Sequence, residues 1–128
     1  MSVMRNILLA SVLLISGGTV AAQAADGDAA AGKTVFNVCK ACHTIEAGGP
    51  NRVGPNLHGV VGRKAGSHDG FSYSAPMKDS GITWDEAKLS EYLKDPKGTV
   101  PGNKMAFAGI KDDAKRADLI AYLASESK

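Results

Sequence analysis

Cys39-Lys40-Ala41-Cys42-His43 is the most informative stretch of this sequence. Two thiols three positions apart at the end of a helix can reach both vinyl groups of one haem. The imidazole of the next residue then points at the iron from the same face. Thioether bonds hold the group without relying on non-covalent affinity, which suits an exported protein. The motif predicts one covalently bound c-type haem, attached through Cys39 and Cys42, with His43 as an axial iron ligand.

Three other uses of the Cys-x-x-Cys pair compete with haem attachment. A thioredoxin-like redox pair requires a βαβ pattern, and strand signals are nearly absent from the chain. A zinc site needs another good ligand, which His58 or His68 could supply, but the sequence has no second cysteine pair. A structural disulfide between Cys39 and Cys42 would close too small a loop to stabilise much. Haem attachment is therefore favoured.

The composition excludes several classes of protein. A chain of 128 residues with 44% hydrophobic and 22% charged residues is typical of one globular domain. Two cysteines cannot form a disulfide-dense scaffold. Fifteen basic against 13 acidic residues give a net charge of +2, which is too little for a nucleic-acid-binding domain.

Residues 1–24 have the pattern of a secretory signal peptide. Arg5 supplies the positive start, residues 7–15 are an apolar run, and Ala22-Gln23-Ala24 is a typical cleavage site. The run is too short for a membrane anchor, since a spanning helix needs about 20 residues. We expect cleavage after about Ala24, a mature domain of residues 25–128 and a periplasmic location in a Gram-negative bacterium.

Three helices are predicted in the mature chain. The first covers residues 28–39 with Asp28 as N-cap, and Gly32 inside it suggests close approach of another element. The second begins at Thr83, where Thr83-Trp84-Asp85-Glu86 matches a capping box, and stops before Pro96. The third covers residues 112–125 and has an apolar stripe. Residues 47–70 hold seven glycines and two prolines without periodicity, which suggests loops wrapped around a large cofactor.

A sixth iron ligand is available in Met105. Pro101 and Gly102 set a tight turn before it, so the loop can place the thioether over the haem. A soft thioether stabilises Fe(II) relative to Fe(III) and raises the reduction potential. The other methionine of the mature chain, Met77, is expected to fill the core.

The chain resembles class I cytochrome c of the mitochondrial and alphaproteobacterial soluble monohaem type. The resemblance covers nearly all of the mature chain. It rests on Cys39-Lys40-Ala41-Cys42-His43-Thr44, Gly54-Pro55-Asn56-Leu57-His58-Gly59, Gly62-Arg63-Lys64, Trp84, Tyr92-Leu93, Pro101-Gly102-Asn103-Lys104-Met105 and residues 116–123. It implies an all-α fold with three main helices, short helical turns and long loops around one haem c.

The resemblance also implies roles for residues in the haem pocket. The Pro55 carbonyl accepts a hydrogen bond from the His43 imidazole, and the Tyr92 hydroxyl lies near the Met105 sulfur. The terminal helices cross where Gly32 and Phe36 meet Leu119 and Tyr122. The haem propionates are bound by Arg63, Tyr73, Trp84 and Asn103. Two positions depart from the mitochondrial pattern, with Met77 in place of a buried asparagine and Phe71 in place of a tyrosine.

The function implied is single-electron transfer between redox complexes. With His43 and Met105 both bound, no iron position is open to a substrate, so outer-sphere transfer is expected and the protein is not an enzyme. The resemblance implies a membrane cytochrome bc complex as donor, and an oxidase, a reaction centre or a soluble reductase or peroxidase as acceptor. Docking would use lysines around the haem edge: Lys97, Lys104 and Lys111, helped by Lys40, Lys64 and Lys94. The alternative is a monohaem peroxidase or ligand sensor in which Met105 is easily displaced.

Overall fold

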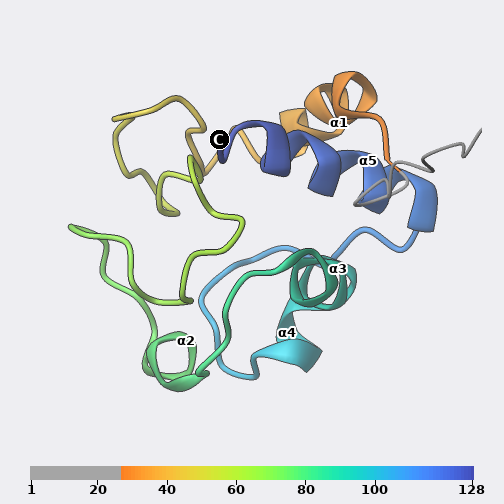
Figure 1. Cartoon of the computed structure of the whole chain (residues 1–128). Helices are drawn as coiled ribbons and strands as arrows, with labels where there is room; N and C mark the ends of the chain where they lie inside the picture. Colours follow the sequence, from red (N-terminus) through yellow and green to blue (C-terminus); the bar gives the residue numbers. More distant parts are fainter. Residues whose placement is uncertain (1–26) are drawn as a thin grey trace, which may run out of the picture.

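The described chain is helical. The structure, a computed structural model, describes residues 27–128, so the expected signal peptide and its cleavage site lie outside the described residues. In the described part, one isolated β-bridge joins Lys64 to Thr83. No helix there is long and apolar enough to cross a bilayer. The helices are α1 (Ala29–Val35), the 3₁₀ helix η1 (Phe36–Val38), α2 (Ala75–Asp79), α3 (Glu86–Lys94), α4 (Pro96–Thr99) and α5 (Asp113–Ser125) (Figure 1).

The first predicted helix is confirmed, with its last turn tightened to 3₁₀ geometry. The Asp28 side chain accepts a hydrogen bond from the Ala30 N–H at 2.9 Å, as expected of an N-cap. The backbone continues from η1 into the cysteine motif through a turn in which the His43 N–H donates to the Cys39 carbonyl at 2.9 Å. Both cysteines and His43 therefore lie in a hydrogen-bonded turn that directly follows the first helix.

The two terminal helices cross, as Figure 1 shows for α1 and α5. At the crossing, a Cβ on Gly32 would collide with the Asp118 carbonyl and lie 2.8 Å from the Tyr122 Cβ. The rings of Phe36 and Tyr122 pack with centroids 5.4 Å apart, and Leu119 is 1% exposed. The close approach predicted from Gly32 is confirmed.

The second predicted helix begins later than expected. Thr83 is not its N-cap, because it lies in the β-bridge opposite Lys64, where the Ala65 N–H donates to the Ile82 carbonyl and the Trp84 N–H donates to the Arg63 carbonyl. The cap of α3 is Asp85, whose carboxylate accepts from the Lys88 N–H at 2.7 Å. The helix ends at Lys94, before Pro96, as predicted, and Pro96 then opens the short helix α4. The third predicted helix matches α5, with Asp112 as its cap.

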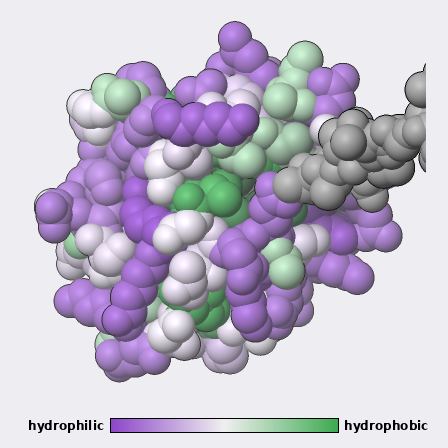
Figure 2. All heavy atoms as spheres, viewed as in Figure 1, coloured by the Kyte–Doolittle hydropathy of each residue, from purple (hydrophilic) through white to green (hydrophobic). Residues whose placement is uncertain are grey.

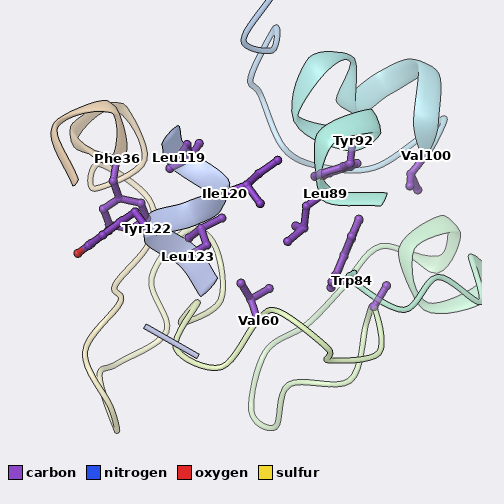
Figure 3. Close-up of a cluster of buried hydrophobic side chains, with 11 residues drawn as sticks. Phe36, Val60, Trp84, Leu89, Tyr92, Val100, Leu119, Ile120, Tyr122 and Leu123 are labelled. Carbon is purple, nitrogen blue, oxygen red and sulfur yellow. The ribbon is translucent and has the colours of Figure 1, made fainter. Parts of the chain in front are cut away.

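Long loops connect the cysteine motif to α2, and residues 47–70 contain no helix, as predicted. They form the yellow and light-green part of Figure 1. The hydrophobic core is shared by three regions (Figure 3). Phe36, Leu119 and Leu123 contribute to the core at the helix crossing, and Leu89 and Tyr92 contribute from α3. Loop residues such as Val60 form the third region.

Candidate haem site

A large cavity lies between these parts of the core. Its volume is about 440 Å³, and it is lined mainly by apolar side chains. Figure 2 shows a strongly hydrophobic area near the middle of one face, bordered by hydrophilic side chains. Core residues from the helix crossing and from α3 both line the cavity, so the core surrounds a space that the protein itself does not fill. Its apolar wall comprises Phe36, Leu57, Val60, Phe71, Met77, Trp84, Leu89, Tyr92, Leu93, Phe107, Leu119 and Leu123, among others.

The two cysteines lie in the wall of this cavity. Both are free thiols and both are partly buried. Burial, helped by the nearby Cys42, raises the pKa of Cys39 to about 11. A thiol of that kind is protonated at neutral pH, whereas redox-active Cys-x-x-Cys pairs need a lowered pKa. The environment therefore favours a structural or attachment role for these thiols over disulfide exchange.

The zinc alternative finds no support in the described residues, where no group of three or more His, Cys, Asp or Glu side chains could hold a metal ion. His58 Nδ1 lies 3.2 Å from the Ile45 carbonyl oxygen, and His68 Nδ1 lies 3.3 Å from Arg63 Nη1. Neither imidazole therefore joins Cys39 and Cys42 in a common site.

His43 is held in one orientation. Its Nδ1 lies 2.7 Å from the Pro55 carbonyl oxygen, which can only accept, so Nδ1 carries the proton and Nε2 keeps a free lone pair. The ring packs directly on Gly54, where a Cβ would overlap it. Burial lowers the pKa of His43, and the charge of Arg63 adds to this effect against the opposing hydrogen bond to Pro55. A neutral, oriented imidazole that lines the cavity has the chemistry of an iron ligand.

Met105 lines the same cavity from the loop after α4. The Tyr92 hydroxyl lies 3.9 Å from the Met105 sulfur, as the resemblance implied, and 3.5 Å from the Asn103 side-chain oxygen. Burial raises the pKa of Tyr92 to about 12, so its hydroxyl remains a donor at neutral pH. A thioether and a phenol donor are thus brought together on the cavity wall.

Asn103 differs from expectation. Its amide nitrogen donates to the Pro96 carbonyl at 2.9 Å and to the Val100 carbonyl at 2.8 Å. An amide group has two N–H donors, and in this structure both serve backbone carbonyls. Its oxygen accepts from the Met105 N–H at 2.9 Å. Asn103 therefore fixes the loop that carries Met105, and its contact with a propionate stays a prediction.

The polar part of the cavity wall contains Arg63, a half-buried cation. Its guanidinium donates to the His58 carbonyl at 3.4 Å and to the Asn56 carbonyl at 3.2 Å, and it contacts His68. Among the described residues Arg63 makes no ion pair with a carboxylate. Burial lowers the pKa of Arg63. A partly buried positive charge on a cavity wall, with no carboxylate partner in the described chain, suits an anionic ligand group.

Two further residues with donor groups line the same space. Trp84 is 7% exposed and lines the cavity, and its indole N–H makes no hydrogen bond to another described residue. The Tyr73 hydroxyl accepts from the His68 N–H at 3.3 Å and keeps its own proton for donation. An apolar cavity with two thiols, an imidazole, a thioether and a cluster of donors fits the apolar ring, the attachment points, the iron and the propionates of haem.

Several cavity residues were not singled out from the sequence. Phe107 follows Met105 by two positions, Val38 directly precedes Cys39, and Val53 directly precedes Gly54, on which the His43 ring packs. The sequence marks these residues only as hydrophobic and close to a motif, which is too weak a pattern to predict that they line the cavity. Met77, predicted to fill the core, is half-buried against it and also lines the cavity.

The lysines predicted for docking are all exposed. Lys104 lines the rim of the cavity, and Lys111 donates from Nζ to the Lys94 carbonyl at 2.5 Å, which ties it to the end of α3. Lys97 lies in α4. The remaining three expected helpers, Lys40, Lys64 and Lys94, also lie on the surface.

Comparison with known proteins gives consistent results. The family model described as cytochrome c matches residues 29–127. The chain is 50% identical to cytochrome c2 of Blastochloris viridis over 87% of each chain. It is 53% identical to cytochrome c-550 of Nitrobacter winogradskyi over 80% of this chain and 94% of that protein. Among solved structures, cytochrome cH from Methylobacterium extorquens matches with a TM-score of 0.74 and 55% identity, covering 77% of this chain and 99% of that one.

Proposed function

Because the chain belongs to the cytochrome c family, we propose that it is a periplasmic monohaem carrier that moves single electrons between redox complexes by outer-sphere transfer. Membership of the family makes it an electron-transfer protein with a covalently attached c-type haem, and Cys39 and Cys42 fit the attachment motif. When bound, the haem supplies a one-electron ferric/ferrous couple.

In this proposal His43 and Met105 are the axial ligands. The observation that carries it is that one cavity brings together the two thiols, the oriented imidazole and the Met105 thioether. The Pro55 carbonyl holds His43 in the tautomer that keeps Nε2 available. Met105 is positioned by two residues. The Tyr92 hydroxyl contacts its sulfur, and the Asn103 side-chain oxygen accepts a hydrogen bond from its backbone N–H. With haem bound, His43 and Met105 would both ligate the iron and leave no position for a substrate, which favours electron transfer over substrate chemistry.

Arg63, Tyr73 and Trp84 are proposed to bind the propionates. All three line the cavity, and each has donor capacity that the described chain leaves unused. The apolar residues around them exclude water. A site whose donors and ligands are fixed in advance changes little between oxidation states, which suits rapid electron exchange.

The proposed partners are a membrane cytochrome bc complex as donor and an oxidase, reaction centre or soluble reductase or peroxidase as acceptor. The name cytochrome c2 among the relatives supports a carrier of this kind. We propose that residues 1–24 direct export and are removed, leaving residues 25–128 as the mature domain. Lys97, Lys104 and Lys111 would steer the carrier toward acidic partner surfaces, with Lys104 placed at the cavity rim.

The test is electron transfer by protein matured in the periplasm. The wild type should take up and release one electron reversibly and be reduced by a purified cytochrome bc complex in a bimolecular reaction. Charge reversal in Lys104→Glu should slow that reaction about threefold or more at low ionic strength and less at high salt. Lys33→Glu, an exposed lysine of α1, is the matched control. Turnover of peroxide by the wild type, with no reduction by the complex, would replace the carrier by the enzyme alternative.

A further inference from the structure

His68 stands beside the proposed haem pocket without a role in it. Its ring Nδ1 lies 3.3 Å from Nη1 of Arg63, and its backbone N–H donates to the Tyr73 hydroxyl at 3.3 Å. Arg63 and Tyr73 both line the cavity, whereas His68 does not. The His68 imidazole therefore contacts one residue of the cavity wall, Arg63, and the His68 backbone contacts another, Tyr73.

The contact between His68 and Arg63 defines a protonation state. A guanidinium can only donate, so the hydrogen bond requires His68 Nδ1 to be an acceptor, and the ring proton must lie on Nε2. A protonated imidazole donates from both nitrogens. Binding a second proton would therefore break this hydrogen bond and place two positive charges side by side.

Arg63 links that event to the centre of the site. Its charge contributes to lowering the pKa of His43, so the Arg63 charge is felt at the imidazole on the cavity wall. Of the charged and titratable groups of the described chain, Arg63 is hydrogen-bonded to the His68 ring, Tyr73 is hydrogen-bonded to the His68 backbone, and Asp69 is its exposed neighbour in sequence. No other described side chain shares a hydrogen bond or ion pair with the His68 ring.

We propose that His68 is a positioning residue that couples the reduction potential to pH through Arg63. Neutral His68 holds the guanidinium against the cavity wall. Protonation at Nδ1 adds a second positive charge beside Arg63 at the cavity wall, which favours the ferrous state and raises the potential. This inference rests on the proposed function and concerns its regulation.

The coupling has a defined balance of charge. The redox partner supplies one electron, and water supplies the proton that forms the N–H bond at His68 Nδ1. By linkage, reduced protein binds this proton more tightly than oxidised protein, so the potential falls as pH rises through the titration of His68. A partly exposed site gives weak coupling, and we expect a difference in proton affinity of about threefold. At 59 mV per tenfold change for one electron, the reduction potential should therefore fall by about 28 mV in total across the titration.

The experiment is a spectroelectrochemical titration of matured protein from about pH 5 to 8.5. Wild type, His68→Gln and His58→Gln are compared. Glutamine keeps a neutral acceptor for Arg63 but cannot take up the proton. His58 is the matched control, because its ring contacts the Ile45 carbonyl and only its backbone carbonyl, which the variant retains, contacts Arg63. In parallel, NMR follows the His68 ring protons through pH titrations of the oxidised and reduced wild type.

The expected result is a potential that falls with pH in the wild type and in His58→Gln but is flat in His68→Gln. The His68 ring should titrate at a higher pH in the reduced than in the oxidised protein. A flat wild-type profile, a pH dependence that survives in His68→Gln, or equal His68 titrations in both states would each overturn the inference while leaving a reversible one-electron couple intact. Absence of that couple would instead remove the proposed function.

Discussion

The Tyr92 side chain combines a buried ring with a hydroxyl that contacts two other residues of the cavity wall. The ring packs on Trp84 with centroids 4.9 Å apart, and the hydroxyl reaches the Met105 sulfur and the Asn103 oxygen. Because burial raises its pKa from 10.0 to about 12, the folded protein binds the phenolic proton more tightly than the unfolded chain does. The resulting stability is present in full below pH 10 and is lost as pH rises toward 12.

Tyr92→Phe should therefore flatten the pH dependence of stability in the alkaline range. Phenylalanine preserves the ring packing and has no proton to lose. Between pH 10 and about 12 the wild type should lose about 2 kcal/mol more unfolding free energy than the variant. The check is urea unfolding of the reduced, matured proteins at stepped pH. Parallel losses in the two proteins across this range would contradict the assignment.

Single residues also show where the sequence was informative about the site. Cys39, Cys42 and His43 were identifiable because the motif spacing encodes the chemistry directly. Pro55 and Tyr92 came from the resemblance, and the structure places both at the expected contacts. Asn103 was expected to bind a propionate, and the structure shows that its amide serves the loop backbone, because an amide can bind a ligand or a backbone equally well. Only the two carbonyls that happen to lie within reach decide which it does.

At the scale of elements, local signals succeeded where no distant segment competed. The Asp28 cap and the Asp112 cap behave as their sequences predict. The capping box at Thr83 failed because a long-range pairing of residues 82–84 with residues 63–65 places Thr83 in the bridge, and the carboxylate of Asp85 caps the helix instead. The short helices α2 and α4 have five and four residues, too few for a periodic pattern to stand out.

The crossing of α1 and α5 gives a prediction at the same scale. Gly32→Val would push a branched side chain into the Asp118 carbonyl and the Tyr122 Cβ, so the helices must separate. We expect a loss of at least about 2 kcal/mol in unfolding free energy. Ala30→Val, on an exposed position of the same helix, should cost only about 0.5 kcal/mol. Denaturant unfolding of both variants compares the two values, and equal losses would show that the crossing is not close-packed.

At the scale of the whole molecule, the core is built around a space of about 440 Å³. The wall of this space is mainly apolar, and its surface is removed from water only when a large apolar group fills it. Small domains have a total stability of about 5–15 kcal/mol, so losing this burial leaves little margin. The glycine-rich loops of residues 47–70 suggested that the chain wraps around a cofactor. Their path could not be predicted, because the haem on which they are expected to pack is not encoded as amino-acid residues.

The same chain without haem should therefore not fold cooperatively. Wild-type protein produced without the maturation machinery should show reduced helical circular dichroism and no sharp thermal transition, whereas matured protein should show both. The comparison uses one sequence, so no substitution complicates it. A cooperative transition of similar midpoint in the unmatured protein would show that the polypeptide core suffices.

The central claim is that Met105 and His43 bind the iron of one covalently attached haem. The most direct measurement is the absorption spectrum of matured protein in both oxidation states, for wild type, Met105→Ala and the control Met77→Ala, whose methionine also lines the cavity. We expect a c-type reduced spectrum and a ferric long-wavelength sulfur–iron band that Met105→Ala abolishes and Met77→Ala retains. A band that is absent from the wild type, or that disappears in Met77→Ala instead, would contradict it.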